Sequence, residues 1–296
     1  SPCKGMKFSE YSFPSKYDAP FSHQVETVKF LLLNLRAFVL NTMGTGKTLS
    51  SLWASDFLFE NNKVQRVLIV GSLSTLHAVW ANELMVHMPH RDFVVLHGPK
   101  QKRRELLAKD VPFYIVNHDG VKLLEKELIA KNFDICIIDE MTAYKTHTSQ
   151  RSKAMQRIAN TIKAVWGMSG SPTANSPIEA YSQARIVNPL NKNLPKTFYK
   201  FRDMVMYQQD QYTWLPRKGW EDTVSHMLSP AIRYTLRECV DLPPTIYEDR
   251  FIEMSAEQAK MYKSMEKEYI AQSEQGLITA SNAGVRYLKL LQISAG

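Results

Sequence analysis

The sequence is poor in cysteine and has no long apolar run. Its 296 residues include three cysteines, Cys3, Cys136 and Cys239, which are widely spaced and form no C-x-x-C pair. This pattern argues against a disulfide framework and against a structural zinc site. No apolar run approaches the roughly 18 to 20 residues that span a bilayer, and the N-terminal segment is polar, without the apolar region of a signal peptide. We therefore expect a soluble protein of a reducing compartment, with no membrane partner.

Basic residues outnumber acidic residues. The 37 Lys and Arg residues against 29 Asp and Glu residues give a formal net charge of +8. Such an excess favours polyanionic partners such as nucleic acid, although charge governs association and not the fold. Hydrophobic residues make up 44% of the chain, and a chain of this length buries a substantial core without covalent staples.

The first half of the chain alternates short apolar runs, rich in Val, Ile and aromatic residues, with amphipathic segments. Apolar runs without inside/outside alternation are typical of parallel strands that are buried on both faces. Strand and helix repeated in this way predict an α/β fold with a doubly wound, mostly parallel sheet. The expected strands are 37–41, 66–71, 93–98, 113–117, 134–140 and 164–170.

Residues 177–240 have a different character. They show little strand pattern and many aromatic and basic side chains, so we expect a helical insertion or protrusion with irregular connections. Its rings would suit stacking on bases, but packing within the protrusion is the better interpretation. These rings include Phe198, Tyr199, Phe201 and Trp214.

A break follows the protrusion at Pro243 and Pro244, because prolines are excluded from the interior of a regular helix. Beyond it, residues 246–254 look like a strand. Ser255 and Gln258 then form a capping-box pattern, which predicts the start of a helix. The predicted parts of the chain are a lobe (1–176), the protrusion (177–240) and a C-terminal part (241–296).

The strongest local signal is the segment LNTMGTGKTLSSLW, residues 40–53. A predicted strand runs into a glycine-rich turn, and an amphipathic helix follows. The sequence matches the phosphate-loop pattern G-x-x-x-x-G-K-[ST] at its last three positions, whereas Asn41 stands at the first glycine position. Small residues let backbone N–H groups approach phosphate oxygens, and the helix N-terminus adds positive charge at the same place.

This loop predicts a nucleotide site. Lys47 is expected to reach the β- and γ-phosphates, and the Thr48 hydroxyl is expected to bind Mg²⁺. The alternative, a glycine-rich turn with an incidental Gly-Lys-Thr, leaves the preceding strand and the following helix unexplained. The expected nucleotide-binding residues are Thr42, Met43, Gly44, Thr45, Gly46, Lys47 and Thr48.

A second signal is the apolar run 134–140, which ends in two carboxylates, Asp139 and Glu140. Ligands of an open α/β sheet bind at the carboxyl ends of its strands. We expect Asp139 to hold Mg²⁺, through water, and Glu140 to polarise an attacking water. The alternative is a solvated Asp-Glu turn after a core strand, which the upstream phosphate loop disfavours.

Taken in order, these segments resemble the first RecA-like lobe of the superfamily-two helicase-like ATPases, and most of all the Swi/Snf-type double-stranded DNA translocases. The resemblance implies a RecA-like P-loop NTPase lobe over 1–176, ATP and Mg²⁺ as cofactors, and duplex DNA, held by its phosphate backbone, as partner. It also implies that residues 241–296 are a connector and the start of a truncated second lobe. The matching segments are HQ (23–24), NTMGTGKT (41–48), LIVGSLSTLHAVWANEL (68–84), IVNHDG (115–120), IIDEMTAYKT (137–146), GMSGSPTANSP (167–177) and LRECVDLPPTIYEDRFIEMSAEQAKMY (236–262).

The resemblance also implies roles for single residues. Gln24 is expected to read the edge of adenine, with a surface position on an amphipathic helix as the alternative. Ser72, Thr75 and Asn117 are expected to contact nucleic-acid phosphates, because hydroxyl and backbone donors at helix starts suit phosphate oxygens. A simple N-cap role is the alternative for Ser72 and Thr75.

Ser169, Gly170 and Ser171 resemble the element that couples the nucleotide site to movement between the two lobes. An ordinary strand-to-helix turn is the alternative. Thr142 departs from the family, which often has His at this position, so the coupling hydrogen bond from there is in question. Asn41 replaces a glycine of the general pattern, but similar proteins tend to have an acidic or polar residue there.

Four further cations follow the 93–98 strand and could line a phosphate backbone, although a solvated helix face is the simpler interpretation. They are Lys100, Lys102, Arg103 and Arg104. We expect the second RecA-like lobe to be absent from this chain, and the isolated chain to be only weakly active. The short segment before Gln24 indicates a compact microbial or phage protein, and hence a cytoplasmic location, or a nuclear one if the source is eukaryotic.

Two other functions stay open at this point. The first is a strand-separating DNA or RNA helicase of the same superfamily, which differs in the nucleic acid that stimulates ATP hydrolysis. The second is a non-catalytic nucleic-acid-binding module with a regulatory nucleotide site. The intact Lys47, Thr48, Asp139 and Glu140 argue against it.

Overall fold

The computed structural model describes residues 8–15, 19–239, 248, 251–274 and 280–295. The chain divides into two compact units, Ser1–Leu242 and Pro243–Gly296, and each is described by itself. Residues 177–240 therefore belong to the same compact unit as the predicted lobe.

The first unit is built on a parallel sheet. Its strands are β1 (Arg36–Val39), β2 (Val67–Gly71), β3 (Phe93–Val95), β4 (Phe113–Asn117), β5 (Ile135–Ile138), β6 (Ala164–Met168) and β9 (Ala231–Ile232). Among the described residues these seven strands lie in the order β3-β4-β2-β5-β6-β1-β9, and every pairing is parallel. The predicted doubly wound, mostly parallel sheet is confirmed.

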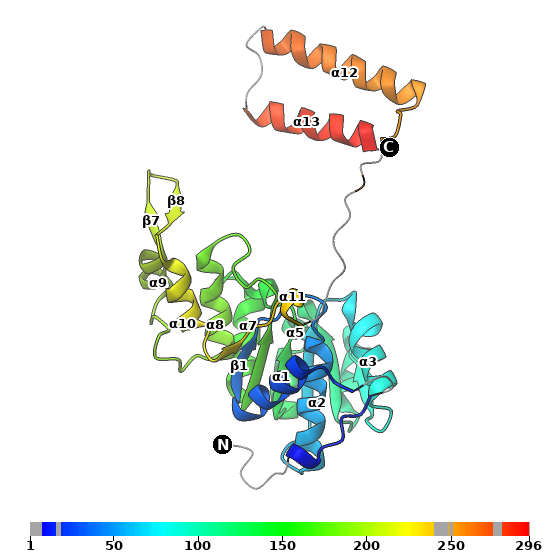
Figure 1. The fold of residues 1–296 in the computed structure, drawn as a ribbon, viewed down its shortest axis with the longest axis vertical. Helices are drawn as coiled ribbons and strands as arrows, with labels where there is room; N and C mark the ends of the chain where they lie inside the picture. The colour runs from blue at the N-terminus through cyan, green and yellow to red at the C-terminus, as the bar shows by residue number, and fades with distance from the viewer. Residues whose placement is uncertain (1–7, 16–18, 240–247, 249–250, 275–279, 296) are drawn as a thin grey trace. The chain divides into compact units, whose positions relative to one another are not determined.

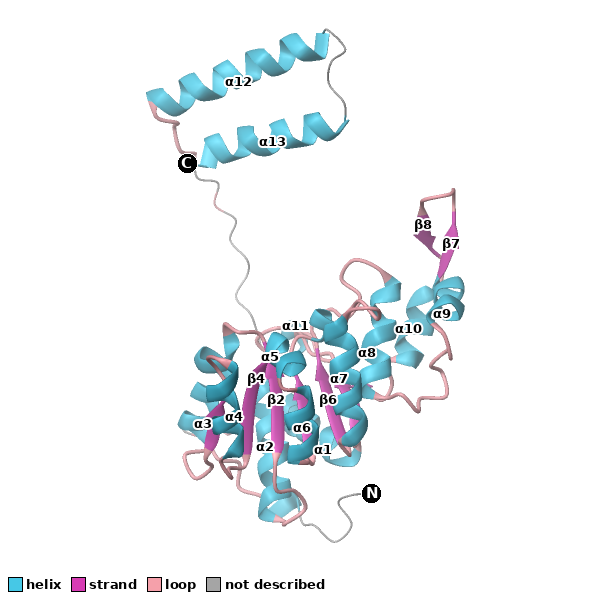
Figure 2. Ribbon diagram, turned by 180° about the vertical axis from the view of Figure 1, so that it is seen from behind, coloured by secondary structure: helices cyan, strands magenta, loops and turns pink. Residues whose placement is uncertain are grey.

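Helices cover both faces of this sheet (Figures 1 and 2). The longer helices are α1 (Ser22–Leu33), α2 (Lys47–Glu60), α3 (Asn82–His87), α4 (Lys100–Ala108), α5 (His118–Leu123), α6 (Glu125–Lys131), α7 (Gln150–Thr161), α8 (Ala180–Val187), α9 (Phe198–Val205), α10 (Trp220–Met227) and α11 (Leu236–Cys239). Short helical turns are η1 (Phe8–Glu10), η2 (Leu76–Ala81, a π-helical turn), η3 (Met141–Tyr144) and η4 (Pro177–Glu179).

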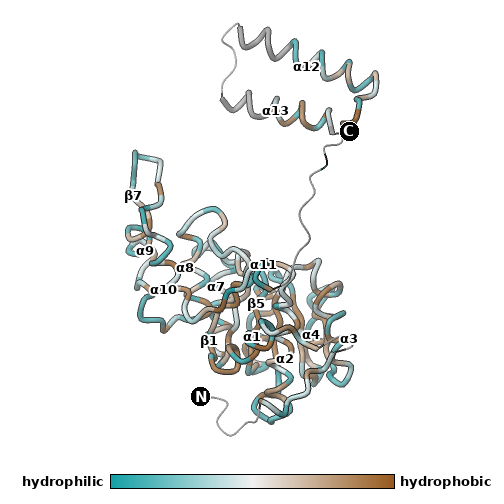
Figure 3. Tube along the Cα trace, in the orientation of Figure 1, coloured by the Kyte–Doolittle hydropathy of each residue, from teal (hydrophilic) through white to brown (hydrophobic). Residues whose placement is uncertain are grey.

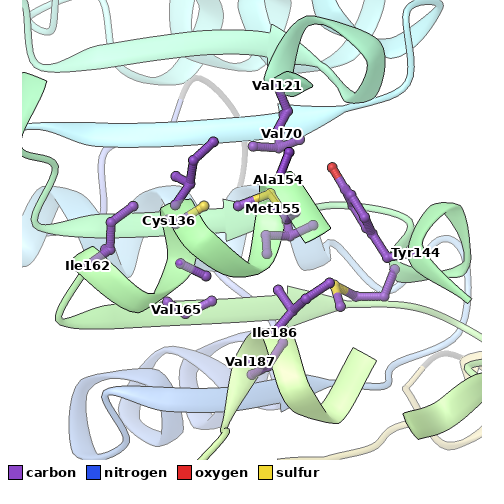
Figure 4. Close-up of a cluster of buried hydrophobic side chains, with 14 of the residues drawn as sticks. Val70, Val121, Cys136, Tyr144, Ala154, Met155, Ile162, Val165, Ile186 and Val187 are labelled. Carbon is purple, nitrogen blue, oxygen red and sulfur yellow. The ribbon is translucent and has the colours of Figure 1, made fainter. Parts of the chain in front are cut away.

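Each face of the sheet has its own apolar core. The α1, α2 and α3 face buries a cluster with Trp53, Trp80 and Trp166, and the opposite face buries a second cluster beneath α4 to α8. Figure 4 shows part of the second cluster, where Met155 of α7 lies over Cys136 and Val165 of the strands. Figure 3 shows the same pattern along the chain, with hydrophobic residues concentrated in the strands and the inner helices. Strands buried on both faces explain the continuous apolar runs of the sequence.

β2 and β4 end where the sequence predicts, at Gly71 and Asn117, whereas the other four predicted strands end earlier. β3 stops at Val95, because the His97 N–H turns back to the Val95 carbonyl (2.9 Å) and Gly98 has a φ of +106°. β5 and β6 stop at Ile138 and Met168, so that the polar residues that follow lie in loops at the sheet edge.

The protrusion is not purely helical, which corrects the prediction. It contains α8, α9 and α10, but also an antiparallel hairpin of β7 (Met206–Gln208) and β8 (Trp214–Pro216). The Asp210 carboxylate accepts the backbone N–H groups of Tyr212 and Thr213 (both 2.8 Å) and closes the turn. The chain then returns to the main sheet as β9, beside β1.

The aromatic rings of the protrusion pack as predicted, but they are buried to different extents. Phe201 is fully buried, and Phe198 and Trp214 are partly buried against the same core cluster. The guanidinium of Arg202 lies 3.9 Å from the centre of the Trp214 ring. Tyr199 is 67% exposed, and its ring packs at the surface of the protrusion, edge to face with Phe198 at 5.9 Å between ring centres.

The described residues of the second unit form two helices, α12 (Ala256–Glu274) and α13 (Ala280–Ala295). The predicted capping box is present, because the Ser255 N–H donates to Gln258 Oε1 (3.0 Å) and the Gln258 N–H donates to Ser255 Oγ (3.2 Å). Residues 251–254 are exposed and form no strand, and most of the remainder of the strand predicted at 246–254 lies outside the described residues. No helix in the described part of the chain is long and apolar enough to cross a bilayer.

Candidate nucleotide and nucleic-acid site

One cleft of about 1380 Å³ lies at the carboxyl edge of the sheet and collects most of the predicted site residues. This edge is where ligands bind in open α/β sheets. The predicted residues that line the cleft are Gln24, Thr42, Met43, Gly44, Gly46, Lys47, Thr48, Ser72, Thr75, Asp139, Glu140, Ser169, Gly170 and Ser171. Two predicted residues, Thr45 and Asn117, are buried beside the cleft and do not line it.

The phosphate loop joins β1 to α2 and depends on two glycines. Gly44 and Gly46 have φ angles of +81° and +74°, in the left-handed region that favours glycine. A Cβ on Gly46 would also lie 2.1 Å from Gln24 Nε2, so a side chain there would displace the Gln24 amide. Because α2 begins at Lys47, the first N–H groups of the helix have no partner within it and face the loop with the positive end of the helix dipole. The loop therefore has the geometry of an anion site.

Lys47 lies across this loop. Its ammonium donates to the carbonyl oxygens of Asn41 (2.8 Å) and Thr42 (3.0 Å). Burial lowers the pKa of Lys47, and the carboxylates of Asp139 and Glu140 oppose that shift. The ammonium is thus held between the loop and the acidic strand end, where a nucleotide phosphate would compensate its burial.

The hydrogen bonds of the Asn41 side chain explain why this position is not a glycine. It is 1% exposed, its Nδ2 donates to Thr27 Oγ1 of α1 (3.2 Å), and its Oδ1 accepts the Tyr234 N–H (2.9 Å). The Thr42 N–H donates to the Tyr234 carbonyl (2.9 Å). The side chain therefore connects the phosphate loop to α1 and to the segment that follows β9. A glycine at this position could make neither bond.

Gln24 lies on the first turn of α1, beside the loop. Its Oε1 accepts the Phe21 N–H (2.9 Å), and its amide nitrogen lies against Gly46. Next to it, His23 Nε2 lies 3.0 Å from the Thr45 carbonyl oxygen. Gln24 is 8% exposed, so that the alternative of a surface glutamine does not apply.

Asp139 directly follows β5 and is held by two donors. Trp80 Nε1 donates to its Oδ2 (3.2 Å), and the Glu140 N–H donates to its Oδ1 (3.0 Å). Burial raises the pKa of Asp139, while these two donors and the Lys47 ammonium oppose the rise. Trp80 was missed at the sequence level, since a tryptophan in an apolar helical segment carries no signal that its indole reaches another strand.

Glu140 has a φ of +52°, in the left-handed region that non-glycine residues seldom adopt. Its carboxylate is exposed at the cleft and accepts the Thr142 hydroxyl. Strain of this kind persists only where the surrounding structure enforces it, and it occurs often at functional sites.

The predicted nucleic-acid residues lie at the ends of β2 and β4. The Ser72 and Thr75 hydroxyls are 3.0 Å apart, and Thr75 donates to the Ser72 carbonyl (3.1 Å), so both stabilise the turn before η2. Asn117 is 7% exposed, and its Oδ1 accepts from Arg103 Nη1 (2.8 Å). Arg103 is itself buried and donates from Nε to the Gly98 carbonyl (2.7 Å), so it belongs to neither a solvated helix face nor a phosphate-lining surface. Lys100, Lys102 and Arg104 of the same helix are exposed.

The segment Ser169–Ser171 follows β6 and lies against the phosphate loop. The Ser169 N–H donates to the Val39 carbonyl of β1 (3.2 Å), and a Cβ on Gly170 would lie 3.8 Å from the Asn41 carbonyl oxygen. Farther along the same segment, Asn175 donates to Glu179 (3.2 Å), which also pairs with Lys145 (3.4 Å) after the acidic motif. The predicted coupling residues thus lie against the loop, and the chain that follows them connects, through Asn175 and Glu179, to Lys145 beyond the acidic motif.

The donor set fits a magnesium-bound nucleotide. Each oxygen of Asp139 has one donor and keeps a lone pair for a metal or for a metal-bound water. Oxygen ligands are those that Mg²⁺ prefers, and Thr48 on the first turn of α2 supplies a hydroxyl. The phosphate loop provides the backbone cradle for the anion.

Comparison with known proteins agrees with this geometry. A family model described as the SNF2-related domain matches residues 23–293. The chain is 24% identical over 298 residues to a protein named p41 from Acyrthosiphon pisum secondary endosymbiont phage 1, covering 94% of this chain and 63% of that protein. It is 26% identical over 282 residues to the TATA-binding protein-associated factor mot1 of Schizosaccharomyces pombe, covering 86% of this chain and 14% of mot1.

A solved structure has the same fold. The Sulfolobus solfataricus SWI2/SNF2 ATPase core in complex with dsDNA superposes with a TM-score of 0.64 at 20% sequence identity, covering 96% of this chain and 60% of that one. The chain therefore spans less than two thirds of these similar proteins.

The fold and the cleft define a RecA-like lobe with a phosphate loop. The family match covers nearly the whole chain, so this chain belongs to the SNF2-related domain family, as the ordered motifs predicted.

Proposed function

We propose that this chain is the ATP-binding motor lobe of an ATP-dependent double-stranded DNA translocase. The observation that carries the proposal is the single cleft in which the phosphate loop, the Asp139–Glu140 pair and the Ser169–Ser171 segment meet. Family membership supports ATP hydrolysis, and the net charge of +8 supports a polyanionic partner.

The residues have separable roles in this proposal. The backbone N–H groups of the loop and the Lys47 ammonium hold the β- and γ-phosphates of ATP, and Gln24 contacts the adenine. Glu140 accepts a proton from the attacking water, while one of its two carboxylate oxygens accepts the Thr142 hydroxyl in this structure. Thr48 and Asp139 hold Mg²⁺, which supplies charge neutralisation on the phosphates.

Duplex DNA is the proposed partner. Ser72, Thr75 and the exposed lysines of α4 lie at strand ends on the same edge as the cleft, where they can contact backbone phosphates. Such binding is independent of sequence and weakens steeply with salt. ATP hydrolysis then changes the position of this lobe relative to a second one, with Ser169–Ser171 as the coupling segment.

The experiment that tests the proposal is steady-state ATP hydrolysis with duplex DNA, single-stranded DNA, RNA or no nucleic acid, together with ATP binding. We expect Mg²⁺-dependent ATP binding, weak turnover without nucleic acid, and stimulation by duplex DNA. Preferential stimulation by single strands or by RNA would favour a strand-separating helicase instead. ATP binding without turnover under every condition, also when a second lobe is supplied, would favour a binding module with a regulatory nucleotide site.

A further inference from the structure

His118 and Tyr144 form a buried pair between two walls of the cleft. His118 begins α5 directly after β4, and Tyr144 ends η3, four residues after Glu140. His118 Nδ1 lies 3.0 Å from the Tyr144 hydroxyl oxygen, and the two rings meet edge to face with centres 5.2 Å apart. His118 is 7% exposed and lines the cleft, and Tyr144 is fully buried (Figure 4).

Both side chains are uncharged at neutral pH. Burial raises the pKa of Tyr144 well above its usual value. Burial and the Arg151 charge lower the pKa of His118 to about 4, although Asp119 opposes that shift. In the tautomer that carries its ring proton on Nε2, His118 accepts the Tyr144 hydroxyl at Nδ1. His118 Nε2 is buried and has no hydrogen-bond partner among the described residues.

An apolar pair would fill this space at a lower cost. A buried polar atom without a partner destabilises the folded state, and such atoms are rare enough to require an explanation. The pair adds one specific property that two apolar side chains lack, which is a directional bond between the end of β4 and η3.

The two residues of this bond lie beside different functional groups: His118 lies next to the predicted nucleic-acid residue Asn117, and Tyr144 lies on the turn that follows Glu140. On the β4 side, Asn117 precedes His118 and is bonded to Arg103 of the basic helix α4. On the η3 side, Glu140 immediately precedes the turn, in a strained backbone conformation and bonded to Thr142. The turn η3 thus lies between the His118–Tyr144 bond and Glu140, which directly precedes it.

We propose that His118, acting through Tyr144, is a positioning residue that couples nucleic-acid binding at the ends of β2, β3 and β4 to the geometry of Glu140. The inference rests on the proposed function. A polyanion on the exposed side of α4 moves the β4 end, and His118 moves with Asn117. Its bond to Tyr144 shifts η3, which releases Glu140 from Thr142 and turns it toward the water that attacks ATP.

The test uses Tyr144→Phe, which removes the hydroxyl and keeps the ring. The single-turnover rate of Mg²⁺–ATP hydrolysis is measured with and without blunt duplex DNA, and the ratio of the two rates is the coupling between the two sites; the affinities for a non-hydrolysable ATP analogue and for DNA are measured separately. We expect a ratio of roughly fivefold or more in the unmodified chain and a ratio near one in Tyr144→Phe and in His118→Phe. Each variant keeps its separate affinities for nucleotide and for DNA within about twofold, and the double variant loses nothing further, because both changes remove one interaction.

Tyr114→Phe is the matched control. Tyr114 is a buried tyrosine of β4 whose hydroxyl donates to the Lys109 carbonyl, away from η3, and its loss leaves the coupling ratio unchanged. Wild-type coupling in Tyr144→Phe overturns the inference, and so does an equal loss in Tyr114→Phe, which indicates a general effect on the fold. Failure of the unmodified chain to bind ATP or duplex DNA overturns the proposed function itself, and this is visible before any variant is made.

Discussion

The two ends of the cleft are built differently. At the nucleotide end, hydrogen bonds between distant segments fix the site: Asn41 joins three segments, and Asp139 is held by Trp80 and by the backbone. At the strand-end side, the Ser72 and Thr75 hydroxyls bond to each other, and the lysines of α4 are exposed. One end is a preorganised anion site, and the other is a set of surface donors.

This difference reflects what each ligand requires. Phosphoryl transfer depends on positioning within fractions of an ångström, which requires side chains that hydrogen bonds hold in place. A duplex backbone presents a regular array of charges, which exposed cations contact without a rigid cradle. Single substitutions are therefore expected to have large effects on ATP binding and hydrolysis at the nucleotide end, and small effects on DNA binding at the strand-end side.

The largest effect is expected for Glu140→Gln. The amide keeps the size and the Thr142 contact of Glu140 but cannot accept the proton of the attacking water, so kcat falls by roughly 10²- to 10⁴-fold. ATP affinity stays within about threefold, because the phosphate contacts are untouched. Single-turnover hydrolysis and nucleotide titration measure the two quantities. Glu83→Gln, which changes another carboxylate of the cleft, serves as control, and equal losses in both variants would contradict the role of Glu140.

Lys47→Ala is expected to lower ATP affinity by roughly 100-fold, because it removes charge-assisted bonds to the phosphates, each worth about 1.5–3 kcal/mol. Duplex binding changes by less than about threefold, which separates the two ends of the cleft. Fluorescent-nucleotide titration and DNA anisotropy report the two affinities. Lys145→Ala removes another ammonium from the same cleft and is the control. Tight Mg²⁺–ATP binding by Lys47→Ala would exclude the nucleotide assignment.

The features that the sequence predicts well are local ones. The strands come from apolar runs, and the loop comes from glycine spacing followed by a lysine and a helix, so both can be recognised within about a dozen residues. Asn41 shows the limit of such reasoning. Its position in the loop was evident, but its bond to Tyr234 joins residues 193 positions apart and has no local pattern.

The same limit applies elsewhere. The Trp80–Asp139 and His118–Tyr144 contacts each depend on the order of strands in the sheet, which brings residues 59 and 26 positions apart together. The β7–β8 hairpin was missed because its strands are three residues long and carry Gln and Tyr where a core strand would carry Val and Ile.

The pH dependence of folding stability distinguishes buried His118 from an exposed histidine. Its pKa is about 4 in the folded chain against about 6.5 unfolded, so below pH 6.5 the unfolded state binds a proton that the folded state does not. The contribution to stability is therefore intact above pH 6.5 and is lost as the pH falls toward 4, by about 2 kcal/mol at pH 5. Denaturant unfolding at pH 7.5 and 5 measures this loss.

His118→Phe should flatten that part of the pH dependence. His226→Gln, a change at an exposed histidine, should leave it as it is. An unchanged pH dependence in His118→Phe would mean that His118 is not a buried neutral group.

The smallest effect is expected at the strand-end side, for the double change Lys100→Ala with Lys102→Ala. Both ammonium groups are exposed on the first turn of α4, so each contributes mainly through the release of counterions from DNA phosphate. Duplex affinity falls a few-fold at low salt, the difference shrinks as salt rises, and the slope of log K against log salt drops by up to about 1.8. ATP affinity does not change. Lys200→Ala with Lys218→Ala removes two exposed charges from the protrusion and is the matched control, since a purely non-specific charge effect would lower duplex affinity equally in both pairs.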